Sequence, residues 1–564
     1  MALFDEEKQN KQLDDLHKQE EEELVATLAE SKYNLPYIDL YRLGIDNEAL
    51  RAISEQDARA LNVAPFKLFG KNIFIALHSP SDDLIKKLKE DLERKSLVPT
   101  FYMASTASIG KVWDRYKEIS MAESSQVGGI DISGEILRAT TKKIEKIQDI
   151  QKMVTEALEG NKIHKISRLL EIVLAGAIAI KASDIHIEPE KDRGRLRLRL
   201  DGVLQDINFF DLSVYHLLNS RIKLLSGMKL TSTIAQDGRF NIEEGEDEIN
   251  IRTSLIPGAY GESIVMRILD PKSIQVKIEE LGIEPHLFSI IEEEISKPNG
   301  MILVTGPTGS GKTTTLYAFL RKIYSPEIKM VTIEDPIEYH LPGITQTQTN
   351  DERGYTFAEG LRSALRQDPD VVMVGEIRDK ETAETAVQSA LTGHIVFSTL
   401  HTNNAAGVIP RLIDLGVNPK ILVSALSLSI AQRLVRKLCQ VCKKEKEIPP
   451  EEMKTLKAII DGMVAEGKKI SDYNINPEAM KIFSAVGCDK CNMTGYKGRL
   501  GIFEAIKTTA EIEKIMPENP SEREIKKVAS GQGILSMRQD GLIKMLEGIT
   551  SFEEVMSVVD LNEE

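Results

Sequence analysis

The sequence has no apolar run long enough to cross a membrane and no secretory signal. Its longest apolar stretch, Leu169 to Ile180, carries Glu171 and falls short of the roughly 20 residues that a membrane-spanning helix needs. The opening residues, MALFDEEKQN, contain neither the basic segment nor the apolar segment of a signal peptide. We therefore expect a cytoplasmic protein that contacts a membrane only through its partners.

An excess of positive charge is missing as well. The net charge of −15 disfavours a broad electrostatic contact with nucleic acid, which needs many Lys and Arg side chains against the phosphates. The composition, 41% hydrophobic and 28% charged residues, is that of a soluble globular protein. A chain of 564 residues is too long for one core and predicts roughly three or four domains. No repeat at a fixed period is present, which argues against a solenoid.

The N-terminal part of the chain divides into an arm, a small domain and a linker. Residues 1–34 form an arm that is rich in charged and amide side chains. Residues 35–105 predict a small α/β domain of regulatory or docking type, in which Phe66–Phe69 and Ile73–Leu77 pair as a hairpin. Residues 106–150 include the glycine-rich SSQVGGIDISG and predict a linker.

The rest of the chain predicts two larger domains and two smaller elements. In the second domain (151–284), arginine and leucine alternate from Arg195 to Leu200, which is the pattern of a strand with one buried face. The third domain (285–435) alternates apolar runs with helical patterns, so a parallel α/β sheet is expected. A cysteine-bounded insertion (436–495) and a helical C-terminal region (496–564) follow. The apolar runs of the third domain are 301–305, 329–333, 371–375 and 395–399.

A glycine-rich phosphate-binding loop follows the first of these runs. GPTGSGKTT has the G-x-x-x-x-G-K-[ST] pattern between a predicted strand and a predicted helix. Its glycines let backbone N–H groups face the phosphates, Lys312 can reach the β- and γ-phosphates, and the Thr313 hydroxyl can hold Mg²⁺. The sequence therefore predicts binding of ATP with Mg²⁺. The predicted nucleotide-binding residues are Gly306, Pro307, Thr308, Gly309, Ser310, Gly311, Lys312, Thr313 and Thr314.

Acids and a histidine stand at the carboxyl ends of the other predicted strands, where open α/β sheets place their ligands. Glu376 ends one strand and is a candidate for contact with the water shell of Mg²⁺. Glu334 ends a second strand and is our candidate for the residue that activates the attacking water, although the sequence does not rank the two acids. His401 follows a third strand and could sense the γ-phosphate or bridge subunits, whereas His394 precedes that strand; a structural role is the alternative for both.

All four cysteines occur in two C-x-x-C pairs, Cys439 with Cys442 and Cys488 with Cys491. Two such pairs supply four thiolates and predict a closed structural zinc site without an open coordination position, and therefore without catalysis. Disulfide bonds are the alternative, although they are rare in a cytosolic protein. The residues between the pairs predict a small insertion that is held at its base.

Five sequence blocks resemble the motif set of the type IV pilus assembly and type II secretion ATPases. The blocks are GPTGSGKTT, VTIEDPIEY, GLRSALRQDPDVVMVGEIRD, TGHIVFSTLHTN and AQRLVRKLC, and the resemblance runs from about Lys162 to the C-terminus. The first four match the family's Walker A loop, aspartate box, Walker B strand and histidine box. By this resemblance, Lys312 and Thr313 contact the nucleotide, Glu334 activates water, Glu376 is the Walker B acid and His401 is the histidine of its box. The cysteine pairs match the zinc element of the assembly and secretion branches, which disfavours a pilus retraction ATPase.

The resemblance implies a fold and a machine. The fold is a RecA-like P-loop motor domain, preceded by a PAS-like α+β domain and a small N-terminal α/β domain. The machine is a homo-hexamer at the inner face of the cytoplasmic membrane, which acts on an inner-membrane platform protein with a cytoplasmic adaptor and drives type IV pilus extension. Some relatives bind cyclic di-GMP through longer motifs than Arg42-Leu-Gly44, so this ligand is not expected here.

Alternatives remain open in two respects. Type II secretion uses the same motifs, and the sequence hardly separates it from pilus extension. A scaffold that binds nucleotide without turnover is the alternative from another class, but intact Lys312, Thr313, Glu334 and Glu376 favour a motor.

Arginines of the second domain are candidates for a contact with the γ-phosphate. The resemblance places phosphate-contacting residues at Arg199 and Arg221, and Arg197 shares the strand of Arg199. We expect Arg199 and Arg221 to reach the nucleotide when the second domain closes over a motor domain. The arginines near the motifs of the motor domain are expected to be structural instead; they are Arg353, Arg362 and Arg366.

Overall fold

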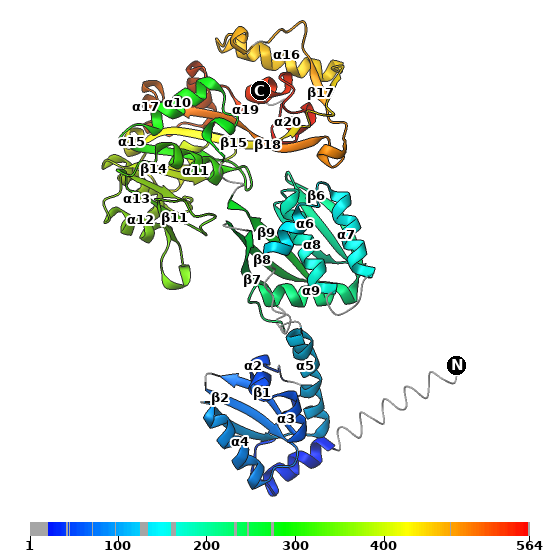
Figure 1. Ribbon diagram of the computed structural model, residues 1–564. Coiled ribbons are helices and arrows are strands. Elements are labelled where there is room, and N and C mark those ends of the chain that lie inside the picture. Colours follow the sequence, from blue (N-terminus) through cyan, green and yellow to red (C-terminus); the bar gives the residue numbers. More distant parts are fainter. Residues whose placement is uncertain are drawn as a thin grey trace. The chain divides into compact units, whose positions relative to one another are not determined.

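The computed structural model describes residues 21–561, except Tyr41, Arg42, Gly44, Gly70, Ser96, Asn474 and the segments 125–133, 160–164, 231–233, 245–246 and 272–275. The predicted arm up to residue 20 and the two ends of the Arg42-Leu-Gly44 sequence thus lie outside the described residues. The chain forms two compact units, Met1–Asp131 and Ile132–Glu564 (Figure 1). Among the described helices, none combines the length and the apolar character that crossing a bilayer requires.

The first unit contains a three-stranded sheet in the order β1-β2-β3. Strand β1 (Val63–Phe69) and β2 (Asn72–Leu77) pair antiparallel, with Leu68 opposite Ile73, which confirms the predicted hairpin. Strand β3 (Val98–Met103) pairs parallel to β2, and α4 (Asp82–Arg94) connects the two. This unit also contains α2 (Asn47–Ala52), α3 (Glu55–Ala60) and α5 (Thr106–Ser124), and residues 21–31 are helical as well.

Most of the segment expected to be a linker (106–150) is helical, which corrects that prediction. Helix α5 fills its first part, and α6 (Gly134–Thr141) and the start of α7 (Ile147–Glu159) fill its end. Leu137 and Ile150 are buried in the core of the second domain, so apolar packing draws these helices into that domain. The boundary between the two compact units, after Asp131, still falls inside this segment.

The second domain contains a six-stranded antiparallel sheet in the order β6-β5-β4-β9-β8-β7. Leu196 and Leu198 are fully buried, and the arginines that alternate with them along β5 face the other side, as the sequence pattern predicted. The buried face packs against α6, α7, α8 (Lys165–Ala179) and α9 (Leu212–Leu225). The strands are β4 (Asp184–Pro189), β5 (Arg193–Leu200), β6 (Val203–Asp211), β7 (Gln236–Glu244), β8 (Asp247–Gly258) and β9 (Gly261–Leu269).

The third domain is built on a seven-stranded sheet in the order β12-β11-β13-β14-β10-β15-β18. All neighbouring strands are parallel except β15 and β18, which pair antiparallel. The strands are β10 (Gly300–Thr305), β11 (Met330–Glu334), β12 (Thr345–Gln348), β13 (Val371–Val374), β14 (Ile395–Leu400), β15 (Leu426–Leu438) and β18 (Tyr496–Lys507). The four strands that the sequence predicted are β10, β11, β13 and β14, so the expected parallel sheet is confirmed.

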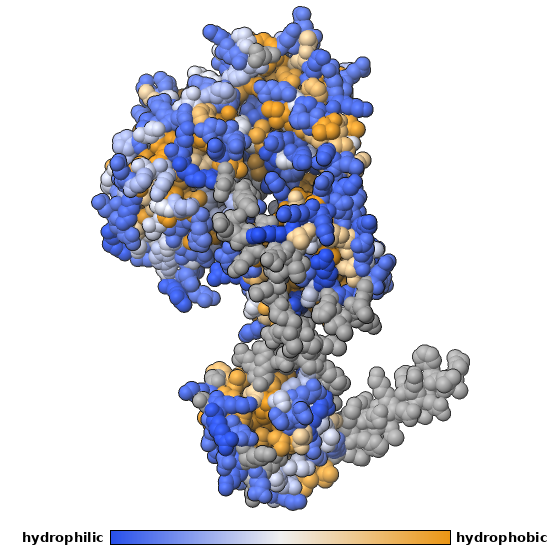
Figure 2. Space-filling model, viewed as in Figure 1, coloured by the Kyte–Doolittle hydropathy of each residue, from blue (hydrophilic) through white to orange (hydrophobic). Residues whose placement is uncertain are grey.

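Helices cover both faces of this sheet, and each face has its own apolar core (Figure 1). One core includes side chains of α10 (Pro285–Ile295) and α11 (Lys312–Ile323). The other includes side chains of α12 (Phe357–Leu365), α13 (Lys380–Leu391), α14 (Val408–Asp414) and α15 (Pro419–Ala425). On the face of the protein shown in Figure 2, polar residues interrupt the apolar ones over most of this second unit.

The sheet extends beyond the predicted end of the core at residue 435, and this is a second correction. Strand β15 continues to Leu438, and β18 occupies the start of the region that was expected to be helical (496–564). Helices follow only after β18; they are α17 (Ala510–Ile515), α18 (Glu522–Ala529), α19 (Met537–Leu546) and α20 (Phe552–Val558). The insertion between the cysteine pairs holds β16 (Lys444–Lys446), α16 (Pro450–Ala465) and β17 (Ile482–Ser484), and it shares an apolar core with α19 and α20.

Candidate nucleotide site

The phosphate-binding loop connects β10 to α11, as predicted. Gly306, Gly309 and Gly311 have φ angles of 147°, 79° and 91°, a backbone region that other residues rarely adopt. The Lys312 Nζ atom donates to the carbonyl oxygens of Gly306 and Pro307 at 2.9 and 3.1 Å, so the ammonium group lies over the loop. Burial lowers the pKa of Lys312, while the charge of Glu376 opposes this shift. Thr313 is exposed at the start of α11, where its hydroxyl is accessible to a cation.

Gln432 of β15 holds this loop from the side. Its Nε2 atom donates to the Ser310 carbonyl at 2.7 Å, and its Oε1 atom accepts from the Thr315 hydroxyl at 2.8 Å. A Cβ atom at Gly306 would lie 2.5 Å from the Gln432 carbonyl oxygen, so only glycine fits there. The neighbouring Arg433 donates to the Asn403 carbonyl at 2.7 Å and thereby connects β15 to the histidine-box segment. Neither Gln432 nor Arg433 was predicted to belong to the site, although the AQRLVRKLC block contains both.

Glu334 lies at the end of β11, and its carboxylate is buried in a hydrogen-bonded network. The residue is 3% exposed. Its Oε1 atom accepts from the Thr332 hydroxyl at 2.6 Å and from Gln346 Nε2 at 3.0 Å, and its Oε2 atom accepts from the Tyr317 hydroxyl.

Glu376 follows β13, and its carboxylate is more accessible than that of Glu334, with 17% of its side chain exposed. It accepts from Arg378, and His401 Nε2 lies 3.2 Å from its Oε2 atom. Burial raises the pKa of Glu376, but the hydrogen bonds and charges of Arg378 and His401 outweigh burial and leave this pKa below its usual range. Arg378 also lies 3.6 Å from Asp335, so it connects Glu376 to the segment predicted as the aspartate box.

The structure therefore brings Lys312, Glu376 and His401 together and places Glu334 behind them in the core. His394 is remote from this cluster, because its Nδ1 atom lies 2.9 Å from the Ser389 carbonyl at the end of α13. That contact agrees with the structural alternative for His394.

The arginines predicted to reach the γ-phosphate have their described contacts within the second domain. Arg199 pairs with Asp184 at 3.2 Å and donates to the Gly202 carbonyl at 3.0 Å. Arg221 is 6% exposed; burial lowers its pKa, and the charge of Glu171 opposes this. Arg197 pairs with Glu188 at 2.5 Å. These contacts leave the predicted roles of Arg199 and Arg221 untested.

A different arginine of the second domain contacts the aspartate box. Arg252 of β8 pairs with Glu338 at 2.8 Å and also donates to the Ile337 carbonyl. In the motor domain, Arg362 pairs with Glu359 and Glu381, and Arg366 donates to the Ser363 hydroxyl. These contacts agree with structural roles for Arg362 and Arg366. Nothing in the sequence pattern of β8 distinguished Arg252 from its neighbours.

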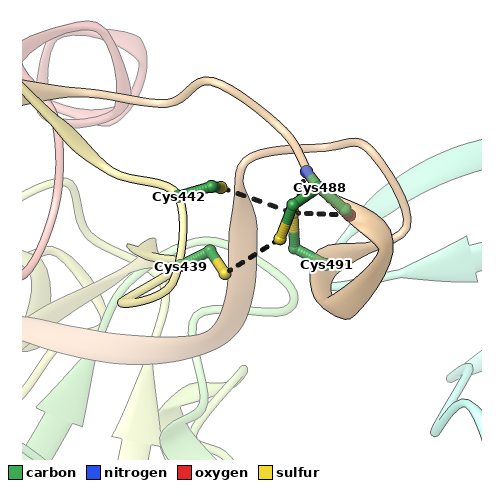
Figure 3. Close-up of side chains that lie close together, drawn as sticks. All are labelled: Cys439, Cys442, Cys488 and Cys491. Atoms are coloured by element: carbon green, nitrogen blue, oxygen red, sulfur yellow. Dashed lines mark hydrogen bonds between the residues drawn. The ribbon is translucent and has the colours of Figure 1, made fainter.

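The four cysteines cluster at the base of the insertion (Figure 3). Their Sγ atoms all lie within 4.8 Å of one another, and no disulfide joins them. Three of the separations are 3.9 Å for Cys439–Cys488, 3.8 Å for Cys442–Cys491 and 3.7 Å for Cys488–Cys491. The backbone N–H groups of Cys488 and Gly495 donate to the Cys491 sulfur, each at 3.2 Å, which is the arrangement that stabilises a thiolate.

Known proteins share this sequence over most of its length. A type IV pilus assembly ATPase of Myxococcus xanthus is 35% identical over 95% of this chain and 91% of its own length. A type II secretion system protein E of Pseudomonas aeruginosa is 39% identical over 84% of this chain and 87% of its own. Among solved structures, the ATPase DotB of Yersinia pseudotuberculosis matches 72% of this chain and 95% of its own, with a TM-score of 0.50 and 21% identity.

The similarity to DotB shows that the two chains share a fold. The model of the family described as type II/IV secretion system protein matches residues 159–557, which include both the second domain and the motor domain. The chain thus belongs to the type II/IV secretion system protein family and is an ATPase of that family.

Proposed function

We propose that this ATPase drives the extension of a type IV pilus. The observation that carries the proposal is the extent of the similarity: the pilus assembly ATPases of Myxococcus xanthus, Thermus thermophilus and Pseudomonas aeruginosa each match 95% of the chain. The type II secretion relatives match between 72% and 84% of it. The longer match favours the pilus. Type II secretion is the second candidate, because its relatives are 39% to 43% identical over the residues that they match, against 35% to 37% for the pilus relatives.

The proposed machine is a cytoplasmic homo-hexamer at the inner face of the membrane. Its subunits would act on an inner-membrane platform protein with a cytoplasmic adaptor. Within each subunit, residues 35–105 are the regulatory or docking domain, 151–284 the PAS-like domain and 285–435 the centre of the RecA-like motor. The antiparallel sheet of the second domain and the parallel sheet of the third support this division.

The residues of the nucleotide site have different roles in ATP hydrolysis. The loop N–H groups and Lys312 bind the phosphates, and Thr313 with Glu376 would hold Mg²⁺, which neutralises charge on the phosphates when bound. Glu334 orients and deprotonates the attacking water. Arg378 and His401 contact the carboxylate of Glu376 and lower its pKa.

The cysteine cluster fits a structural zinc ion. Four thiolates around Zn²⁺ at about 2.3 Å form a tetrahedron with edges of roughly 3.8 Å. The separations of 3.7, 3.8 and 3.9 Å agree with those edges. The bond between two disulfide sulfurs is about 2.05 Å, so the same separations disfavour the disulfide alternative. Cys439, Cys442, Cys488 and Cys491 would fill every position around the metal, which therefore stabilises the insertion and takes no part in hydrolysis.

Loss of the gene tests the proposed function. We expect a deletion strain to lose its surface pili while secretion of folded exoproteins continues, because the motor supplies the work of pilin assembly. Expression of the wild-type protein should restore the pili, and expression of Lys312→Ala should not, since the loop then lacks its charge on the phosphates. Electron microscopy and exoprotein assays measure the two outcomes. Intact pili together with failed exoprotein secretion would instead assign the protein to type II secretion.

The variant Glu334→Gln should separate binding from chemistry. The amide keeps the shape of the side chain but takes up no proton, so turnover should fall by about 100-fold or more while ATP affinity changes by less than about 3-fold. Steady-state phosphate release and binding of a fluorescent nucleotide measure the two quantities on the purified protein. An equal loss of binding and turnover would make Glu334 a residue that positions the nucleotide instead.

Metal removal should loosen the insertion and leave the phosphate-binding loop in place. We expect about one zinc per chain after purification under reducing conditions, because a closed four-thiolate site contributes its binding energy to local folding. Chelation should then raise amide hydrogen exchange in residues 439–491 well above that of β10 and α11. Well under one zinc per chain would contradict the metal site.

The double variant Arg199→Ala, Arg221→Ala tests closure of the second domain over a nucleotide. Turnover should fall strongly with a modest loss of ATP affinity, because an arginine contact matters most as charge develops in the transition state. Arg193→Ala is the control, since this exposed arginine of the same strand pairs with Glu190. Unchanged turnover in the double variant would remove these two arginines from the mechanism.

A further inference from the structure

A buried tyrosine connects the phosphate-binding helix to the acid that we assign to water activation. Tyr317 lies on α11, the helix that Lys312 begins, and its side chain is fully buried. Its hydroxyl donates to Oε2 of Glu334 at the end of β11. Burial, and then the charge of Glu334, raise the pKa of Tyr317 far above its usual range. The hydroxyl therefore keeps its proton and acts towards this carboxylate as a donor.

The other oxygen of the carboxylate is fully occupied. Oε1 accepts from Thr332 at 2.6 Å and from Gln346 at 3.0 Å, which uses both of its acceptor positions. Gln346 itself is fixed, because its Oε1 atom accepts from the Leu341 N–H at 2.6 Å and its Nε2 atom also donates to the Tyr339 carbonyl at 2.8 Å. The Gln346 amide thus has one orientation, and the carboxylate of Glu334 cannot rotate without breaking several hydrogen bonds.

Oε2 is different, since the Tyr317 hydroxyl uses only one of its two acceptor positions. One acceptor position on a rigid, 3% exposed carboxylate remains for a water molecule. The direction of that position is set by the direction from which the tyrosine donates.

We propose that Tyr317 is a positioning residue for ATP hydrolysis: its hydroxyl aims Oε2 of Glu334 at the attacking water. The proposal rests on the proposed role of Glu334 and extends it to a residue that touches neither nucleotide nor water. It also connects α11, the helix that follows the phosphate-binding loop, directly to the acid that we assign to water activation. A displacement of α11 when phosphates bind at its N-terminus would be transmitted to the carboxylate through one hydrogen bond.

The variant Tyr317→Phe tests the proposal, because it removes the hydroxyl and keeps the ring. We expect kcat to fall by about 10-fold or more while the KM for ATP changes by less than about 2-fold, since the lost interaction acts on the chemical step. The control is Tyr116→Phe, in which another buried tyrosine loses a hydroxyl that donates to the Ile53 carbonyl in the first unit. Its turnover should match that of the wild type. Equal kcat values for Tyr317→Phe and wild type would overturn the proposal.

A double-mutant cycle separates positioning from a general effect on the fold. If Tyr317 acts through Glu334, adding Tyr317→Phe to Glu334→Gln should cause no further loss of turnover. If the double variant loses turnover by the product of the two single-variant factors, the Tyr317 hydroxyl acts elsewhere than on Glu334. That result would overturn the proposal while leaving the role of Glu334 intact. Full turnover in Glu334→Gln alone would refute the role of Glu334 first, and the positioning role with it.

A second variant covers the case in which Tyr317→Phe does not fold. Thr332→Val removes a donor from Oε1 of the same carboxylate, so it too should lower kcat and show no further loss in the Glu334→Gln background. If Thr332→Val lowers turnover further in the Glu334→Gln variant, its effect does not depend on the Glu334 carboxylate. That result would contradict the proposal that this carboxylate is held in place for catalysis. Melting temperatures of all variants identify those that have lost stability and whose lower turnover therefore reflects the fold alone.

Discussion

The two hydrogen bonds of the Gln432 side chain are the contacts on which the nucleotide site depends. They join β15 to both the loop and the helix that receives the phosphates, through Ser310 and Thr315. A glycine-rich loop has little conformational preference of its own, so a fixed neighbour must define its shape. Because Gln432 is 2% exposed, water does not compete for these hydrogen bonds. The same strand continues to Leu438, directly before Cys439, so one strand supports both the loop and the proposed metal site.

The two acids of the site differ in how they are held. Glu334 accepts from Tyr317, Thr332 and Gln346 inside the core, whereas Glu376 contacts Arg378 and His401 nearer the surface. A carboxylate that several donors hold keeps its direction, which suits the orientation of a single water molecule. The more accessible carboxylate of Glu376 would instead help Thr313 to hold Mg²⁺. The environments thus support the division of roles that the sequence alone did not rank.

Local patterns predicted the parts of this protein that depend on neighbours in the sequence. The phosphate-binding loop, the four central strands and the clustering of the cysteines follow from spacing and hydrophobic runs, and the structure contains them all. Contacts between distant segments were not predictable in this way. The hydrogen bonds of Gln432, Gln346 and Arg252 depend on strand order, which no local pattern encodes. Strand β18 was missed for the same reason, since its pairing with β15 joins segments on opposite sides of the insertion.

The pairing of β15 with β18 also has an evolutionary consequence. Leu438, where the chain leaves the sheet, lies opposite Tyr496, where it returns. The residues between Leu438 and Tyr496 are therefore a long insertion into a β-hairpin, and the sheet fixes the two ends of this insertion. Loop closure depends only weakly on length, so the parts of this insertion that lie outside its apolar core can be lengthened or shortened without moving a strand of the motor. Variation of that kind would adapt one ATPase to different machines.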